Sequence, residues 1–166
     1  MDKPISVFVA KEINGETVES DRDTFTDLFC GIDDKDFIVK VKFFDISLKK
    51  EHQGEDVINV DFEDRENINE ILLNSARESL CDVMVVFNQN TAPKEKFIET
   101  LCEDLTDDNI FATYSDYSAD GIPLVQNLPI VICRRIDDEN ALYNTENCKG
   151  VIKYIPMDLY DIFTKV

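Results

Sequence analysis

Apolar and polar residues follow two different spacings along this chain, and each spacing predicts a type of secondary structure. Short apolar runs rich in β-branched residues are typical of strands, whereas apolar residues three or four positions apart indicate helices packed on one face. The pattern predicts strands at 5–10, 37–44, 57–62, 83–87, 110–114, 122–125, 130–133 and 151–155. It predicts helices from about 20 to 30, 67 to 80, 93 to 105 and 157 to 163. Asp120 and Gly121 are expected to form a turn between two of the strands.

The alternation of strands and helices predicts the fold class. The wholly apolar run at 83–87 is expected in a strand covered on both sides, as in a parallel sheet between helices. We therefore expect an α/β, three-layer fold with a mainly parallel sheet flanked by helices. A chain of 166 residues has the usual length of one domain, so residues 1–166 are expected to form a single compact domain.

Polar residues follow three of the predicted strands. Asp45 comes after the second strand, Asn88-Gln89-Asn90 after the strand at 83–87, and Asp116 after the strand at 110–114. Ligands of parallel α/β sheets bind outside the carboxyl ends of the strands, so these residues are the first candidates for a binding site. The glycine-rich motifs that bind nucleotide phosphates, G-x-x-x-x-G-K-[ST] and G-x-G-x-x-G, do not occur in the sequence.

The charge balance limits the partners of the chain. Asp and Glu number 35 and Lys and Arg 17, giving a formal net charge of −18. Nucleic acids and anionic membranes are repelled by such a charge, whereas a basic protein surface is attracted. We therefore expect neither nucleic-acid nor membrane binding and regard a basic protein as a possible partner.

The cysteines and the single histidine limit the metal chemistry that the chain can support and indicate the redox state of its compartment. Five cysteines without a C-x-x-C pair are expected to be reduced, and those beside apolar runs, including Cys30, are expected to be buried. The only histidine, His52, lies in a polar stretch, so a histidine-rich zinc site is not expected. The sequence shows no signal peptide and no apolar run of about 20 residues, so a cytoplasmic location is predicted.

One stretch of the chain carries a family resemblance. Residues 74–93 contain an Asn/Ala/Arg cluster, an apolar strand ending in Asn88-Gln89-Asn90, and then Pro93. This order resembles the central stretch of family-2-like glycosyltransferases with the GT-A fold, whose strand ends in an Asp-x-Asp motif. The resemblance in order extends over residues 5–121. It implies a nucleotide-diphospho-sugar transferase (GT-A)-like fold and a sugar nucleotide as ligand.

The resemblance also implies roles for particular residues. Asp45, Asn88, Asn90 and Asp116 correspond to positions of the nucleotide-binding site. Asp138 and Glu139 are placed like the later carboxylate that acts in these enzymes as a general base towards the acceptor hydroxyl. In a chain with 35 acidic residues, such an acidic loop is also typical of a solvated surface, and both interpretations stay open.

The chain departs from the family at the metal-binding motif. Asn88 and Asn90 replace its two aspartates, and an amide oxygen brings no negative charge to a hard cation such as Mn²⁺ or Mg²⁺. We therefore assign no metal ligands and expect a divalent cation only if the site is still active. Two hypotheses follow. The chain is a glycosyltransferase-like domain that binds a sugar nucleotide, or it is a catalytically inactive acidic interaction protein that retains the scaffold.

Overall fold

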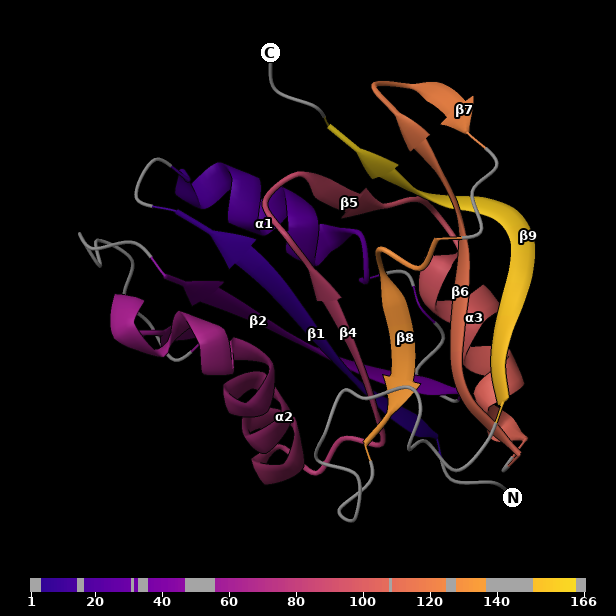
Figure 1. Cartoon of the computed structure of the whole chain (residues 1–166), viewed down its shortest axis with the longest axis horizontal. Helices are drawn as coiled ribbons and strands as arrows, with labels where there is room; N and C mark the ends of the chain where they lie inside the picture. Colours follow the sequence, from indigo (N-terminus) through magenta and orange to yellow (C-terminus); the bar gives the residue numbers. More distant parts are fainter. Residues whose placement is uncertain are drawn as a thin grey trace.

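The computed structural model describes residues 4–14, 17–30, 32, 36–46, 56–107, 109–124, 128–136 and 151–163, which form one α/β sheet structure (Figure 1). The strands are β1 (Ile5–Ile13), β2 (Phe37–Asp45), β3 (Val57–Asn59), β4 (Val83–Phe87), β5 (Thr91–Pro93), β6 (Ile110–Ala119), β7 (Ile122–Leu124), β8 (Ile132–Arg135) and β9 (Val151–Ile162). The helices are α1 (Glu19–Asp27), α2 (Ile68–Glu78) and α3 (Phe97–Glu103), with 3₁₀ turns η1 (Phe62–Asn67) and η2 (Asp104–Thr106).

The sheet is mixed, and its longest pairings are parallel. The strand order is β3-β2-β1-β4-β8-β6-β9-β5, with β7 beside β6. Strands β1 to β4 run parallel, β8 lies antiparallel between β4 and β6, and β9 runs parallel to β6. The chain moves outward from β1 to β3 and then returns to the other side of β1 as β4. The strand order therefore reverses at β1, and β1, β2, β4 and β6 end at the same edge.

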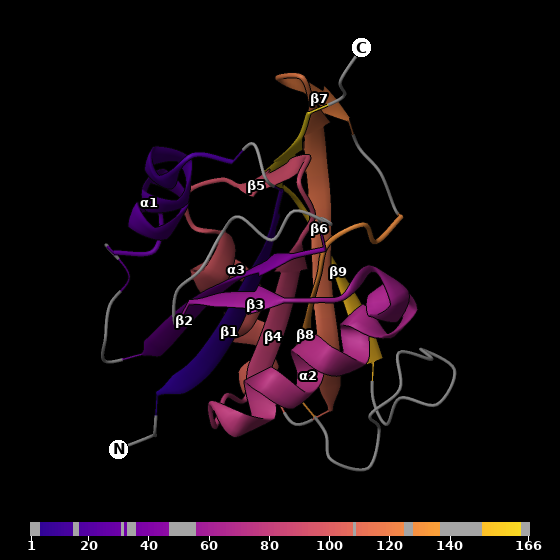
Figure 2. The ribbon, with the colours of Figure 1, turned by 90° about the vertical axis from the view of Figure 1, so that its left-hand side faces the viewer.

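Helices lie on both faces of the sheet (Figures 1 and 2). Strand β1 alternates between these faces, with Val7 and Val9 on one and Phe8 and Ala10 on the other. Helix α2 packs against the second face, and helices α1 and α3 contribute to the core on the first. A fully buried aliphatic or aromatic side chain contributes roughly 1.5–3 kcal/mol, so burial on both faces makes β1 and β4 the centre of the core.

The structure corrects two of the predicted elements. No helix forms at 157–163, because β9 continues as one strand from Val151 to Ile162. Pro93 does not begin a helix: it lies in β5, which pairs with β9, and α3 begins only at Phe97. Both differences come from pairing between segments distant in sequence. Local spacing does not reveal such pairing, and Pro93 occupies a three-residue strand at the end of the sheet, where proline is tolerated.

Other expectations are confirmed within two residues or corrected at one end: the strand expected at 110–114 continues to Ala119, so Asp116 lies inside β6 and not after the strand. The strand at 83–87 is β4, and the helix predicted at 67–80 is α2. The strand expected at 57–62 ends at Asn59, and the strand expected at 130–133 forms two residues later. Asp120 and Gly121 form the turn between β6 and β7.

The cysteines in the described residues are reduced. Cys81, Cys102 and Cys133 are buried as predicted, whereas Cys30 is exposed because it follows the carboxyl end of α1. None of the helices in the described ranges is long and apolar enough to span a membrane.

Candidate functional site

A pocket of about 250 Å³ lies where β1 ends, between the start of α1 and the turn that follows β4. Strand β1 contributes Lys11 and Glu12, helix α1 contributes Asp21 and Arg22, and the turn after β4 contributes Gln89. Because the strand order reverses at β1, this is the type of position at which open α/β sheets bind ligands. The volume falls just below the usual range for sites that hold a drug-sized molecule.

The floor of the pocket is aromatic. Phe25 of α1 and Phe43 of β2 are buried, and their ring centroids lie 5.9 Å apart in an edge-to-face arrangement. The end of β1 is connected to the segment before α1, because Thr17 Oγ1 accepts a hydrogen bond from the backbone N–H of Asn14 at 3.1 Å. Glu19 and Asp21 stand in the first turn of α1, where acidic side chains interact favourably with the helix dipole. These contacts fix the pocket wall formed by α1 on the sheet.

The ammonium of Lys11 makes three hydrogen bonds at the pocket. Its Nζ donates hydrogen bonds to the backbone carbonyls of Asn88 at 2.6 Å, Gln89 at 3.3 Å and Thr91 at 2.6 Å. It also lies 5.7 Å from the centre of the Phe25 ring. Burial lowers the pKa of Lys11 from 10.5 to about 8, and the nearby Glu12 carboxylate offsets part of this change. An ammonium has three donors, and here three carbonyls accept them.

The turn after β4 is held by its own amide side chains. Asn88 Oδ1 accepts a hydrogen bond from the backbone N–H of Asn90 at 2.9 Å. Gln89 Oε1 accepts one from Asn14 Nδ2 at 2.8 Å, and Gln89 Nε2 donates to Glu12 at 3.2 Å. The turn after β4 thus wraps around a lysine, and the Asn88 side chain stabilises the turn itself.

Asp45 and Asp116 lie at the predicted edge but do not line this pocket. Asp45 ends β2, is fully buried, and pairs in register with Ile13 of β1. Asp116 is buried on β6, and the Tyr154 hydroxyl donates to its carboxylate at 2.6 and 2.7 Å. This hydrogen bond, together with burial, raises the pKa of Tyr154 to about 12.

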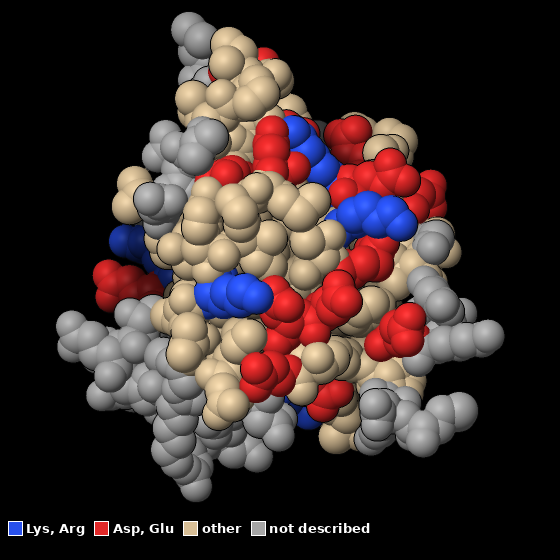
Figure 3. All heavy atoms as spheres, turned by 90° about the vertical axis from the view of Figure 1, so that its right-hand side faces the viewer, with Lys and Arg blue, Asp and Glu red and all other residues tan. Residues whose placement is uncertain are grey.

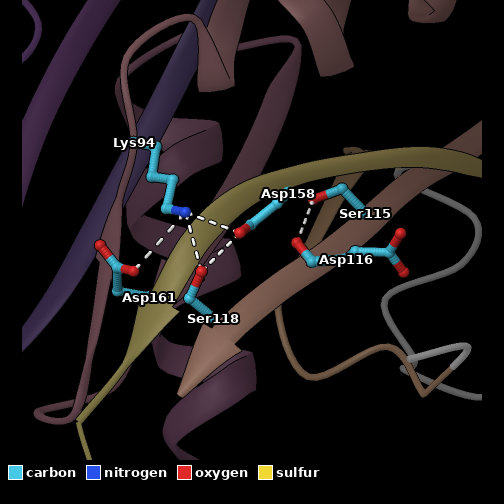
Figure 4. A network of polar contacts seen from close by, with 6 residues as sticks. All are labelled: Lys94, Ser115, Asp116, Ser118, Asp158 and Asp161. Atoms are coloured by element: carbon cyan, nitrogen blue, oxygen red, sulfur yellow. Dashed lines mark hydrogen bonds and ion pairs between the residues drawn. The ribbon is translucent and has the colours of Figure 1, made fainter. Parts of the chain in front are cut away.

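A second polar cluster joins β5, β6 and β9 (Figure 4). Lys94 Nζ donates to Ser118 Oγ at 2.8 Å and to Asp158 Oδ2 at 2.7 Å, and lies 3.8 Å from Asp161. Ser118 also hydrogen-bonds Asp158. A serine beside a lysine is one arrangement used in nucleophilic catalysis. Ser118 is almost fully buried, however, and Lys94 is ion-paired, so this cluster links strands rather than meeting a substrate.

The structure brings together only part of the predicted site. Asn88 and Asn90 share one turn, Asp45 is separated from that turn by β1, and Asp116 is separated from it by β8. Asp138 and Glu139 lie outside the described residues. Within the described ranges, no three His, Cys, Asp or Glu side chains are grouped as metal ligands.

Sequence reasoning missed Lys11 and Arg22, two charged side chains that line the pocket, whereas Gln89 belongs to the candidate segment Asn88-Gln89-Asn90. A signal for Lys11 existed: it is a charged residue directly after the apolar run at 5–10, at the carboxyl end of a buried strand. No comparable local signal marks Arg22, because its place in the pocket depends on the packing of α1 against β1.

Comparison with models of known protein families found no match, and comparison with curated proteins found none either. The fold and the pocket therefore give only the class of the protein. It is an α/β protein with a mixed, mostly parallel sheet and a pocket lined by polar and aromatic side chains where the strand order reverses.

Proposed function

We propose that this chain is a glycosyltransferase-like domain of GT-A type that binds the nucleotide of a sugar nucleotide without a divalent metal ion. The observation that carries this proposal is the Lys11 ammonium, which is bound by three carbonyls of the turn that replaces Asp-x-Asp. In the enzymes that the sequence resembles, a metal ion supplies positive charge beside this turn. Here the chain provides one positive charge of its own.

Electrostatics supports the exclusion of a metal ion from this turn. A divalent cation within about 5 Å of the ammonium would be repelled by several kcal/mol at an effective dielectric constant of about 20. The Asn88 and Asn90 side chains offer no negative charge to offset that repulsion. The proposed binding mode is therefore independent of Mn²⁺ and Mg²⁺.

The pocket contains groups that suit a nucleoside. Phe25 and Phe43 form an apolar floor for a flat ring. Glu12 and Asp21 are acceptors for N–H groups of a base or hydroxyls of a ribose. Arg22 also lines the pocket and brings a guanidinium, a group that suits an anionic acceptor such as a phosphate oxygen.

A thermal-shift and calorimetric titration tests this proposal. Uridine, UDP, UDP-sugars and their guanosine equivalents are added with and without Mn²⁺. At about 100 times its Kd, a ligand stabilises the folded state by about 2.7 kcal/mol, which raises Tm by roughly 5–10 °C for a domain of this size. We expect such a shift with at least one nucleotide and no further shift when Mn²⁺ is added.

A matched pair of variants locates the binding site. Arg22→Gln removes a guanidinium from the pocket wall, and Arg77→Gln removes one from α2 on the other face of the sheet. Arg22→Gln should weaken nucleotide binding about tenfold, whereas Arg77→Gln should leave it unchanged. Binding that requires Mn²⁺ would contradict the metal-free mode, and the absence of a shift with every nucleotide would refute nucleotide binding.

The second candidate function is that of a catalytically inactive acidic interaction protein that retains the scaffold. The burial of Asp45 and Asp116 favours it, because neither carboxylate is offered to a ligand in the pocket. The surface also favours it: acidic side chains, with a few Lys or Arg among them, border an uncharged area on the β9 side of the molecule (Figure 3). A basic partner whose association weakens steeply as salt is raised would support this function, and a purely salt-independent partner would contradict it.

A further inference from the structure

The hairpin formed by β6 and β7 extends beyond the rest of the sheet (Figures 1 and 2). Asp120 and Gly121 connect the two strands with φ angles of 51° and 83°. Two consecutive left-handed residues form the tight turn whose twist matches that of a two-strand ribbon. The hairpin is therefore a defined structure that places the three residues of β7 away from the core.

Four large apolar side chains of β7 and of residues 128–130 are exposed. The exposed fractions are 65% for Ile122, 36% for Leu124, 66% for Leu128 and 44% for Ile130. Strand β7 pairs with β6 on one side, and no other strand in the described ranges pairs with its second side. Exposed large apolar side chains beside an unpaired strand edge are typical of an interaction surface.

The same segment is free of charge in a highly charged chain. No residue from 121 to 133 is charged, although charged residues make up 31% of the sequence. In Figure 3 the projection at the top is mostly uncharged, and acidic side chains lie below it. Near the base of the hairpin, Asp158 and Asp161 of β9 share the ammonium of Lys94 among the described residues.

We propose that the hairpin surface, formed by Ile122, Leu124, Leu128 and Ile130, binds a segment of another protein that is apolar at its centre and rich in Lys or Arg on both sides. An apolar centre with a polar rim is the usual anatomy of a protein interface. The apolar centre of the partner covers the exposed aliphatic side chains, and its basic flanks meet the acidic rim. This function is separate from the nucleotide pocket, which contains no residue of β6 or β7.

The negative charge of the chain favours a basic partner at the hairpin surface over a second copy of the chain. Two molecules that each carry a net charge of −18 repel one another, and their acidic rims would meet around the hairpin. A basic partner is instead attracted by the net negative charge of the chain, and its basic flanks meet the acidic rim favourably.

The test uses two synthetic peptides and the ¹⁵N-labelled full chain in an NMR titration. Both peptides share a central Val-Leu-Val-Leu sequence, and one carries lysines and the other glutamates on each side. We expect the lysine-flanked peptide to shift amide signals within 117–124 and 128–133. We also expect its affinity to fall at least tenfold between 50 and 500 mM salt, and the glutamate-flanked peptide to bind at least tenfold more weakly.

Variants distinguish specific binding at the hairpin surface from nonspecific hydrophobic binding elsewhere on the chain. Ile122→Ser/Leu124→Ser removes two exposed aliphatic side chains of the hairpin, and Leu128→Ser/Ile130→Ser removes the other two. Ile38→Ser is the control, because Ile38 is an exposed aliphatic residue on β2 with an exposed fraction of 44%. Each hairpin pair should weaken the lysine peptide at least tenfold, whereas the control should change its affinity less than twofold, with Tm unchanged in all three.

Three results would overturn the proposal. The first is equal affinity for both peptides, and the second is a set of shifted signals that lies outside the hairpin. The third is a dimer of the wild-type chain in sedimentation velocity that the hairpin variants abolish, because the occupant would then be a second copy.

Discussion

Replacing Lys11 by methionine removes an ammonium from the pocket and keeps a side chain of similar length. Two effects oppose each other at neutral pH. The carbonyl of Thr91, a buried residue, loses a donor, which costs about 1–3 kcal/mol when a buried acceptor is left without a partner. The variant also avoids placing a desolvated charge at this position. We therefore expect the free energies of unfolding of wild type and Lys11→Met to lie within about 1 kcal/mol at pH 7.

The pH dependence separates the two proteins. The pKa of Lys11 is about 8 in the folded state and near 10.5 in the unfolded chain, so between these values the unfolded state binds one more proton. Wild-type stability therefore rises with pH in this window, by about 1.4 kcal/mol per pH unit. With an allowance for the partial exposure of the side chain, the total gain is about 2 kcal/mol. Lys11→Met has no such gain.

Urea denaturation at pH 7, 8, 9 and 10 measures this difference, with the midpoint and slope fitted for each protein. The wild type should become more stable than Lys11→Met by about 2 kcal/mol between pH 7.5 and 10. Lys40→Met is the control for loss of one positive charge, because Lys40 also lies on a strand and donates to a single carbonyl, that of Ser79, at 2.8 Å. A difference between wild type and Lys11→Met that stays flat, or shrinks as pH rises, would refute the reasoning, since the carbonyl hydrogen bonds would then outweigh desolvation.

Three further predictions concern stability and reactivity. Leu80 has a φ of 58° just after α2 and is 85% exposed, so Leu80→Gly should stabilise the fold by roughly 0.5–1 kcal/mol in urea denaturation. Tyr154→Phe removes the hydroxyl that donates to the buried Asp116 carboxylate and should lower the urea midpoint of unfolding. Native-state alkylation with iodoacetamide, followed by mass mapping, should label Cys30 and leave Cys133 unlabelled. Cys133 is fully buried, and a hydrogen bond with the neighbouring thiol together with burial raises its pKa.

Each of these predictions has its own contrary outcome. Destabilisation by Leu80→Gly would mean that the leucine side chain contributes contacts worth more than the backbone strain it imposes. Tyr114→Phe is the control for Tyr154→Phe, because it removes a hydroxyl from the neighbouring ring, whose centroid lies 5.4 Å from that of Tyr154. Equal losses from both variants would show that removal of a tyrosine hydroxyl in general, and not the hydrogen bond to Asp116, carries the effect. Alkylation of Cys133 at the rate of Cys30 would show that the core opens readily in the native state.

Much of the fold could be predicted from the sequence because its core elements are locally consistent. The apolar run at 83–87 reads as a strand covered on both sides, and β4 is buried between helices. The apolar stripe of α2 and the Asp-Gly turn after β6 are also visible in the local pattern. Such elements need only neighbouring residues to define their period and their ends.

The carboxyl edge of the sheet could be predicted as the place for a site, but the pocket itself could not. Asp45 ends β2 and Asn88 follows β4 at that edge, whereas Asp116 lies inside β6. The pocket depends on how α1 packs over β1 and on the turn that encloses the Lys11 ammonium. Neither arrangement leaves a periodic signal, since each joins residues more than ten positions apart.

The sequence by itself determined the α/β class, the strong negative charge and the uncharged segment Asn88-Gln89-Asn90 after the strand at 83–87. Only the tertiary structure decided that residues 157–162 belong to a strand, because β6 offers a parallel partner along its whole length. Tertiary structure also decided that a positive charge, the Lys11 ammonium, lies at the turn after β4. Strand register places Lys11 beside Phe87, so its side chain reaches the carbonyls of the turn. A chain with a large surplus of acids thus encloses a lysine ammonium in the turn after β4.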